Sequence, residues 1–321
     1  MIDQPLDSFL LRMTTMTHHR WHLLEKLQVE VAAAVGLVLM YFVAWPMLRP
    51  WDPDGAVVFL PHLAIGRLVV FALAVWAVTA LCTLLTLTAR PEGSLLAALV
   101  AVGAISLRSG PIRLLLMRYQ HDFSHLYSPL IAELFALAVV LIGTGAVVLG
   151  LRRAVRNIKP GWIRPESISL PAAKPVKGKK PAGKSGLAGQ AVSFAASCAI
   201  TILVAVVMLA ITLFSADRGQ ILFGLAVSFF AGSALAQYLF PNRNAGSNCL
   251  AVLLLGIVFY AKACLVPGGD LAWVNIDPIA QALPVDWLAA GCGGAVGGFW
   301  LSSRLHDAKH LGNPQATPSE E

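Results

Sequence analysis

Apolar residues occur along the chain in eight long runs, each ended by polar, proline or glycine residues. A bilayer core about 30 Å thick is crossed by roughly 20 helical residues, so these runs predict transmembrane helices. The strands of a membrane barrel would be half as long and would alternate apolar with polar residues, which this pattern does not do. The predicted spans are 31–48, 68–89, 95–107, 129–151, 191–214, 221–240, 249–266 and 284–303.

The third run is the shortest. At 1.5 Å per residue, 95–107 covers only about 20 Å, so it either stops short of the far surface or forms a re-entrant pair with the next apolar segment. That segment, residues 112–119, is apolar except for Arg113 and Arg118. This pattern predicts a short helix at the membrane surface, with both guanidinium groups reaching into water.

Basic residues gather in one connection, which sets the predicted orientation. Residues 152–190 hold ten lysines and arginines but one acidic residue, and the loops on the two sides otherwise carry equal numbers of basic residues. The positive-inside rule therefore places this linker and both termini in the cytoplasm. Its prolines and lysines predict an unfolded tether beside anionic lipid headgroups. Residues 1–29 are expected to form a helix on the cytoplasmic surface, and 306–321 a cytoplasmic tail.

The composition agrees with this topology. The 321 residues are 57% hydrophobic and 13% charged, with a mean hydropathy of +0.71. Such values exclude a soluble domain, a disordered chain and a disulfide scaffold, and they predict an all-α, multi-pass protein of the cell (inner or plasma) membrane. The five cysteines lie in or next to spans and are expected to be free thiols. Since the net charge of +7 comes from the linker, we expect no nucleic-acid partner.

The two groups of four spans resemble each other weakly. They form the predicted membrane halves, 30–151 and 191–305. A shift of 153 residues superposes Glu133 on Asp286, although the first span of each half does not fit it. A parallel repeat of this kind would place functional sites at the seam between the halves. The shift also pairs Arg90, Gly93, Ser94, Ala98 and Gly103 with Arg243, Gly246, Ser247, Ala251 and Gly256.

Small residues recur at helical spacing in the second half. They predict close packing of helices, either within the chain or against another subunit. The hydroxyl groups of Ser193, Ser197 and Thr201 share one face of the fifth span and can bond across a helix pair. The expected packing positions are Gly224, Ser228 and Gly232 in the sixth span and Gly291, Gly294 and Gly298 in the eighth.

Ionisable residues are absent from the predicted midplane of every span. An ion-coupled pump normally places them there, so this pattern disfavours ion coupling. Glu133 and Asp286 lie a few residues inside the outer ends of their helices. We expect them to form ion pairs at the interface, Glu133 with Arg67 and Asp286 with Lys262; the alternative is an outward-facing polar pocket at the seam.

Six of the eight histidines form pairs four residues apart, which on a helix puts both imidazoles on one face. The pair His121 and His125, with Asp122 between them and His62 in the first outer loop, is the candidate for a divalent metal such as zinc. Without a fixed third ligand the spacing is more typical of surface histidines, so no cofactor is expected. If the pair were catalytic, Glu133 could join it and Arg113 and Arg118 could hold an anionic substrate.

Three functions fit the sequence. The first is a non-catalytic subunit or scaffold of a membrane assembly, with lipid and a membrane-protein partner or a second copy of the chain around it. The second is a passive carrier or channel for a small or amphipathic solute, which uses the seam. The third is a membrane enzyme with the outer His/Asp site. No nucleotide-binding loop, serine-hydrolase motif or zinc-protease motif occurs in the chain.

Overall fold

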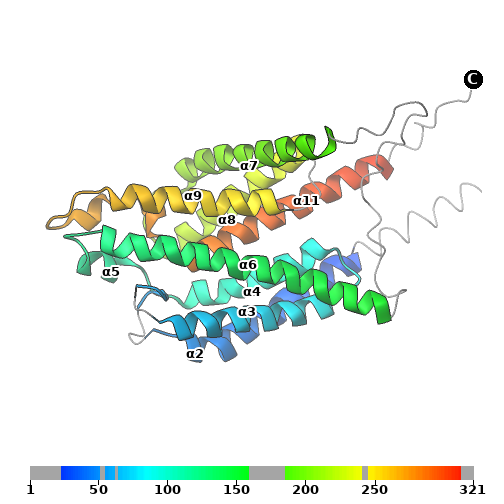
Figure 1. Ribbon diagram of the computed structural model, residues 1–321, viewed down its shortest axis with the longest axis horizontal. Coiled ribbons are helices and arrows are strands. Elements are labelled where there is room, and N and C mark those ends of the chain that lie inside the picture. The colour runs from blue at the N-terminus through cyan, green and yellow to red at the C-terminus, as the bar shows by residue number, and fades with distance from the viewer. Residues whose placement is uncertain (1–22, 51–54, 62–63, 159–184, 241–244, 312–321) are drawn as a thin grey trace, which may run out of the picture.

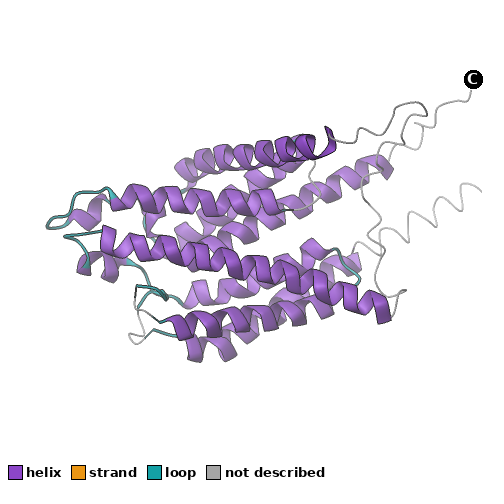
Figure 2. Ribbon diagram, in the orientation of Figure 1, coloured by secondary structure: helices purple, strands orange, loops and turns teal. Residues whose placement is uncertain are grey.

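The computed structural model describes residues 23–50, 55–61, 64–158, 185–240 and 245–311. These residues form helices and short connections, with no strand among them (Figure 2). Seven of the described helices are long and apolar enough to cross a membrane. The all-helical, multi-pass membrane class predicted from the sequence is therefore confirmed at this level.

The seven candidate spans are Leu23–Leu48, α3 (Ile65–Leu85), α4 (Pro91–Arg108), α6 (Ser124–Ile158), α7 (Ser185–Thr212), α8 (Arg218–Leu239) and α9 (Gly246–Cys264). The first of them ends in a π-helical turn, η1 (Met40–Ala44), and in α2 (Trp45–Leu48). A short helix, α5 (Arg113–Arg118), lies between α4 and α6. Two 3-10 turns follow α9: η2 (Ala272–Asn275) and η3 (Pro278–Gln281). The last long helix then runs without a break through α10 (Pro284–Asp286), the π-helical turn η4 (Trp287–Gly291) and α11 (Cys292–Leu311).

The helices lie side by side along one axis (Figure 1). The described chain ends at Leu23, Ile158 and Leu311 all lie at one end of the bundle, which we call the terminal end; α5 lies at the other, the α5 end. Helices α7, α8, α9 and α11 group together above the first span, α3, α4 and α6. The two groups meet where α6 packs on α9 and where α4 packs on η4, α10 and α11, and we call this boundary the seam.

Several boundaries differ from the predicted ones. The first helix already includes residues 23–29, which were expected in a surface helix; the rest of that segment lies outside the described residues. Helix α4 starts at Pro91, so the third span is 18 residues long and counts among the candidates. Residues 152–158, expected in the tether, continue α6. The predicted eighth span corresponds to α10, η4 and α11, but its many glycines and charged end keep it outside the seven.

One pair of helix starts agrees with the shift of 153 residues found in the sequence: Ile65 begins α3 and Arg218 begins α8. The first span and α7 do not follow it, as the sequence also indicated.

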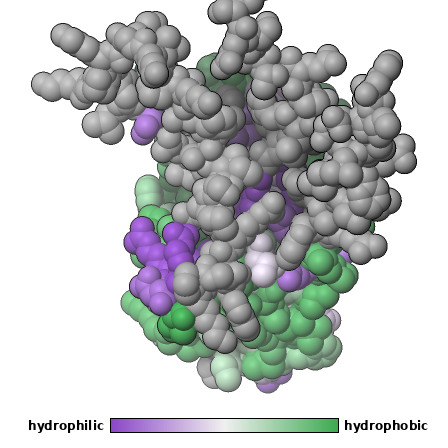
Figure 3. Space-filling view, turned by 90° about the vertical axis from the view of Figure 1, so that its right-hand side faces the viewer, coloured by the Kyte–Doolittle hydropathy of each residue, from purple (hydrophilic) through white to green (hydrophobic). Residues whose placement is uncertain are grey.

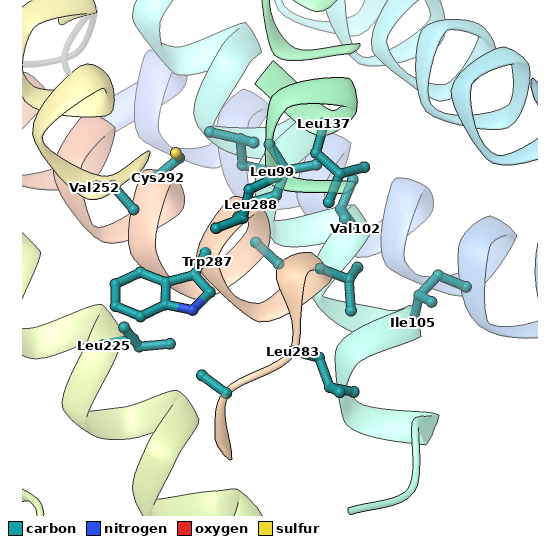
Figure 4. Close-up of a cluster of buried hydrophobic side chains, with 14 of the residues drawn as sticks. Leu99, Val102, Ile105, Leu137, Leu225, Val252, Leu283, Trp287, Leu288 and Cys292 are labelled. Carbon is teal, nitrogen blue, oxygen red and sulfur yellow. The ribbon is translucent and has the colours of Figure 1, made fainter. Parts of the chain in front are cut away.

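Apolar side chains fill the seam. Figure 4 shows Leu99 and Val102 of α4 and Leu137 of α6 close to Leu288 of η4, whereas the Trp287 ring points toward Leu225 of α8 and Val252 of α9. All of these side chains are buried, and Trp287 is fully enclosed. Outside the bundle, the visible flanks in Figure 3 are largely hydrophobic, as expected for surfaces that face lipid. The described part of the chain therefore has a packed interior and an apolar exterior.

Candidate functional site

The strongest polar contact at the α5 end joins α8 to α10. Arg218, in the first turn of α8, donates two hydrogen bonds of 2.7 Å to the two oxygens of Asp286. The same guanidinium also reaches the Ser106 carbonyl of α4, at 2.7 Å. Asp286 is fully buried, and its carboxylate also accepts the Leu283 N–H at 2.7 Å. Because Ser106 belongs to the first half, this α5-end clamp holds the two halves together.

The expected partner of Asp286 was wrong. Lys262 lies at the end of α9 and pairs with Asp277 at 2.7 Å, in an exposed position. Arg218 starts a helix far from Asp286 in sequence, and only the packing of α8 against the last helix brings the two together. A planar guanidinium also matches a carboxylate with two parallel bonds, which a lysine ammonium group does not.

A second buried ion pair closes the seam at the terminal end. Arg304 of α11 lies 2.9 Å from Glu25 of the first helix, and both side chains are nearly buried. The guanidinium also stacks on the Trp300 ring, with its central carbon 3.9 Å from the ring centroid. Glu25 in addition accepts the N–H of Arg90 at 3.1 Å. We call this contact the terminal-end clamp.

Arg152 anchors α6 to the turn between α3 and α4. It donates to the carbonyl oxygens of Thr86 and Ala89, at 2.9 and 2.6 Å, and to the Ser94 hydroxyl at 3.2 Å. Its side chain is buried. The first basic residue of the predicted tether is thus part of the folded bundle, because the carbonyl groups of this buried turn need donors that a helix does not supply.

Glu133 lies under the connection between the first helix and α3. Residues 55–61 fold inward as a non-helical segment, with Val57 and Phe59 buried. The Glu133 Oε2 atom accepts the backbone N–H groups of Phe59 and Leu60, at 2.8 and 3.0 Å. Ser109 Oγ accepts the Val57 N–H at 2.8 Å. A non-helical backbone in this position needs such acceptors, since lipid supplies none.

The expected ion pair of Glu133 with Arg67 was also wrong. Glu133 forms no ion pair with any residue of the described ranges. Its side chain is fully buried, and its second oxygen, Oε1, has no hydrogen-bond partner. The two carboxylates that the sequence aligned therefore have different environments: Asp286 has a cation and Glu133 has peptide N–H groups.

The small residues expected to pack helices lie at contacts within the chain. A Cβ atom on Gly232 would lie 2.8 Å from the Thr201 carbonyl oxygen of α7. Cβ atoms on Gly294 and Gly298 would overlap the backbone of α8. Gly291 faces the Val252 side chain of α9. Gly224 meets the Thr212 and Leu209 side chains of α7, and Ser228 is buried on the same helix.

Hydroxyl groups of α7 bond across a helix pair, as expected. Ser197 donates to the Asn248 side-chain oxygen of α9 at 2.9 Å, and Thr201 reaches the same oxygen at 3.2 Å. The Asn248 amide group donates to Ser233 of α8. This buried network ties three helices of the second half together. All five cysteines are free thiols, as the sequence predicted.

The histidine site is only partly assembled. His125 Nδ1 lies 2.9 Å from Asp122 Oδ2, and both side chains are exposed. The other Asp122 oxygen accepts the Ser124 N–H and hydroxyl at 2.9 and 2.6 Å, where α6 begins. These bonds, above all that of the Ser124 hydroxyl, lower the pKa of Asp122. His62 and residues 51–54 lie outside the described ranges, and within those ranges no three metal-ligating side chains come together.

The other residues proposed for this site lie apart from the histidines. Arg113 stacks on the Trp273 ring of η2, 4.5 Å from its centroid, and Arg118 lies 6.0 Å from the Tyr119 ring centroid. Glu133 is more than two turns further along α6 and faces residues 55–61 instead. The carbonyl of His121 packs against Gly268. In the described structure, the polar candidates therefore form separate contacts and not one site.

The residues that sequence reasoning missed are those whose partners lie far away along the chain. Arg218, Arg304 and Glu25 looked like ordinary loop or helix-end charges. The one usable signal was position: Arg218 and Arg304 each lie within a turn or two of an apolar run. Charges at span ends usually face water, so this signal alone does not separate clamps from surface residues.

Comparison of the chain with descriptions of known protein families, with curated proteins and with solved structures found no match.

Proposed function

We propose that the protein is a non-catalytic, multi-pass component of a membrane assembly, acting as a subunit or scaffold. The observation that supports this most is the seam: its centre is filled by buried apolar side chains such as Leu99, Leu137 and Leu288, and it is clamped at both ends by buried ion pairs. A tightly packed interior resists the opening that a substrate path requires. The apolar outer faces of the helices then provide the surface for partners.

In this proposal the terminal end faces the cytoplasm of a cell whose inner or plasma membrane holds the protein. The basic residues of 153–190 lie beside anionic lipid headgroups, and neither nucleic acid nor a cofactor takes part. We further propose that the two groups of helices arose by duplication. The starts of α3 and α8, which lie 153 residues apart as the sequence shift requires, support this.

Site-specific photo-crosslinking tests the assembly. A photoreactive residue would replace Ile142 of α6 or Val207 of α7, whose side chains are exposed on outer faces. The matched control replaces Leu137, which is buried on α6. In native membranes, an assembly component gives a discrete protein adduct at one of the exposed positions and none at Leu137. Lipid adducts alone at both exposed positions would contradict the proposal.

A passive carrier is the second candidate, and one observation favours it. The clamps lie at opposite ends of the seam, where a carrier would have gates, and the π-helical turns η1 and η4 both pack on α4. Such turns often occur at functional sites. Opening a gate would raise solute flux, so Arg218→Gln or Glu25→Gln should make liposomes leakier to small solutes if the seam is a path. If the protein is a scaffold, the same variants should lower its stability and leave the solute flux unchanged.

A further inference from the structure

Glu133 is buried as completely as Asp286 but lacks its cation. Two backbone N–H groups bond to one carboxyl oxygen, and the other oxygen has no partner. An ionised carboxylate in this setting would leave half of its charge facing apolar atoms such as those of Phe59. Burying the neutral acid costs far less, because only a hydroxyl then remains unpaired.

The aligned site in the second half shows what ionisation requires in this fold. There Arg218 begins α8 and supplies two charge-assisted bonds to Asp286. The position aligned with Arg218 is Ile65, which begins α3 and is exposed and apolar. The first half therefore has the carboxyl group without the arginine.

Charged and titratable groups on the elements packed against α6 do not compensate Glu133. Asp286 is bound by Arg218, and Lys262 by Asp277. Arg108 of α4 donates to the Tyr41 carbonyl at 2.9 Å. Other groups near the α5 end have interactions of their own: Arg67 of α3, Tyr127 of α6, which donates to the Ala280 carbonyl, and Tyr260 of α9, which donates to the Ala282 carbonyl.

We propose that Glu133 is a proton-binding site, and that its bound proton keeps residues 55–61 folded against α6. In the closed state the neutral carboxyl group accepts the Phe59 and Leu60 N–H groups through Oε2. When the proton leaves, the carboxylate needs water, which reaches it only if the covering segment moves outward. There is therefore a pH interval in which the open state has already lost the Glu133 proton and the closed state still holds it. Opening consequently becomes about tenfold more favourable for each pH unit of rise in that interval. This proton site does not depend on whether the protein is a scaffold or a carrier.

Infrared spectroscopy tests the protonation directly. The full-length protein in lipid nanodiscs is compared at neutral pH with its Glu133→Gln variant, which keeps an oxygen acceptor but cannot titrate. A carbonyl band of a protonated side-chain carboxyl should be present in the wild type, disappear on alkalinisation and be missing from the variant. Asp277→Asn, which changes an exposed carboxylate, should keep the band. Identical carboxyl bands in the wild type and Glu133→Gln would overturn the proposal.

Hydrogen–deuterium exchange tests the coupling to residues 55–61. Wild type and Glu133→Gln are compared at the same pH, so that the intrinsic exchange rate cancels. Amides of Phe59 and Leu60 should exchange about tenfold faster in the wild type for each pH unit above the onset of opening, whereas their protection in Glu133→Gln should stay constant. If that variant fails to fold, the wild type alone still tests the proposal against amides of α9. If the amides of residues 55–61 showed the same pH dependence of protection as the amides of α9, the proposal would be overturned.

Discussion

Arg218 and Asp286 meet through two parallel hydrogen bonds of 2.7 Å, in a site where Asp286 has no exposure to solvent. The same guanidinium bonds to the Ser106 carbonyl, so a single side chain connects α8, α10 and α4. At the other end of the seam, Arg304 and Glu25 connect α11 to the first helix. The two halves are therefore fixed to each other at both ends, around an apolar centre.

Removing one partner of the α5-end clamp should destabilise the protein strongly. Arg218→Ala leaves the Asp286 carboxylate buried without a cation, which typically costs about 3–5 kcal/mol. Lys262→Ala is the matched control, because its pair with Asp277 is exposed and should contribute at most about 1 kcal/mol. Denaturation in detergent, monitored by circular dichroism, gives the free energy of unfolding of both variants. Equal losses in the two variants would show that the clamp has no special role.

Adding one carbon atom at the contact of α8 with α7 or α11 should also destabilise the fold. Gly232→Ala places its Cβ 2.8 Å from a backbone oxygen of α7, and Gly298→Ala overlaps the backbone of α8. Overpacking of this kind costs about 1–3 kcal/mol. Gly145→Ala on α6 is the control, since a Cβ there meets nothing within 4 Å. It should be neutral or slightly stabilising, because alanine favours helix. A melting temperature of Gly298→Ala at or above that of Gly145→Ala would contradict this packing.

The sequence predicted the helices well and their polar contacts poorly, for physical reasons. Spans follow from apolar runs, which are local, so α3, α8 and α9 lie within a few residues of their predicted places. The positions of Glu133 and Asp286 along their helices followed from those runs, although their complete burial was not expected. Their partners did not, because pairing depends on which helices pack together. The inward fold of residues 55–61 was missed as well, since a short apolar loop carries no periodic signal.

Acid should weaken the start of α6 through Asp122. Its pKa lies below the ordinary value because the ionised carboxylate accepts bonds from Ser124. Because the pKa is lowered in the folded state, the ionised Asp122 carboxylate stabilises the fold fully above its ordinary pKa near 4. This stabilisation is lost as the pH falls further. Asp122→Asn keeps an oxygen acceptor at every pH. The melting temperature of the wild type should therefore fall relative to this variant as the pH drops below about 4, and parallel curves would contradict the assignment.

The histidine pair should not hold a stoichiometric metal ion if the protein is non-catalytic. His125 already pairs with Asp122, and that carboxylate also bonds to Ser124. Elemental mass spectrometry of protein purified with a tag free of histidine should find no zinc, and chelators should leave the melting temperature unchanged. The double variant His121→Ala, His125→Ala is the comparison. One equivalent of zinc in the wild type that is lost in this variant would instead favour the metal-enzyme hypothesis.

The central claim is that the chain works as a packed component of a larger membrane assembly. Native mass spectrometry of the protein extracted from its own membrane within a lipid nanodisc tests this most directly. The account predicts a protein mass above the 34.1 kDa of a single chain, with the same excess in independent preparations and at low expression. A single chain of 34.1 kDa under all these conditions would contradict it.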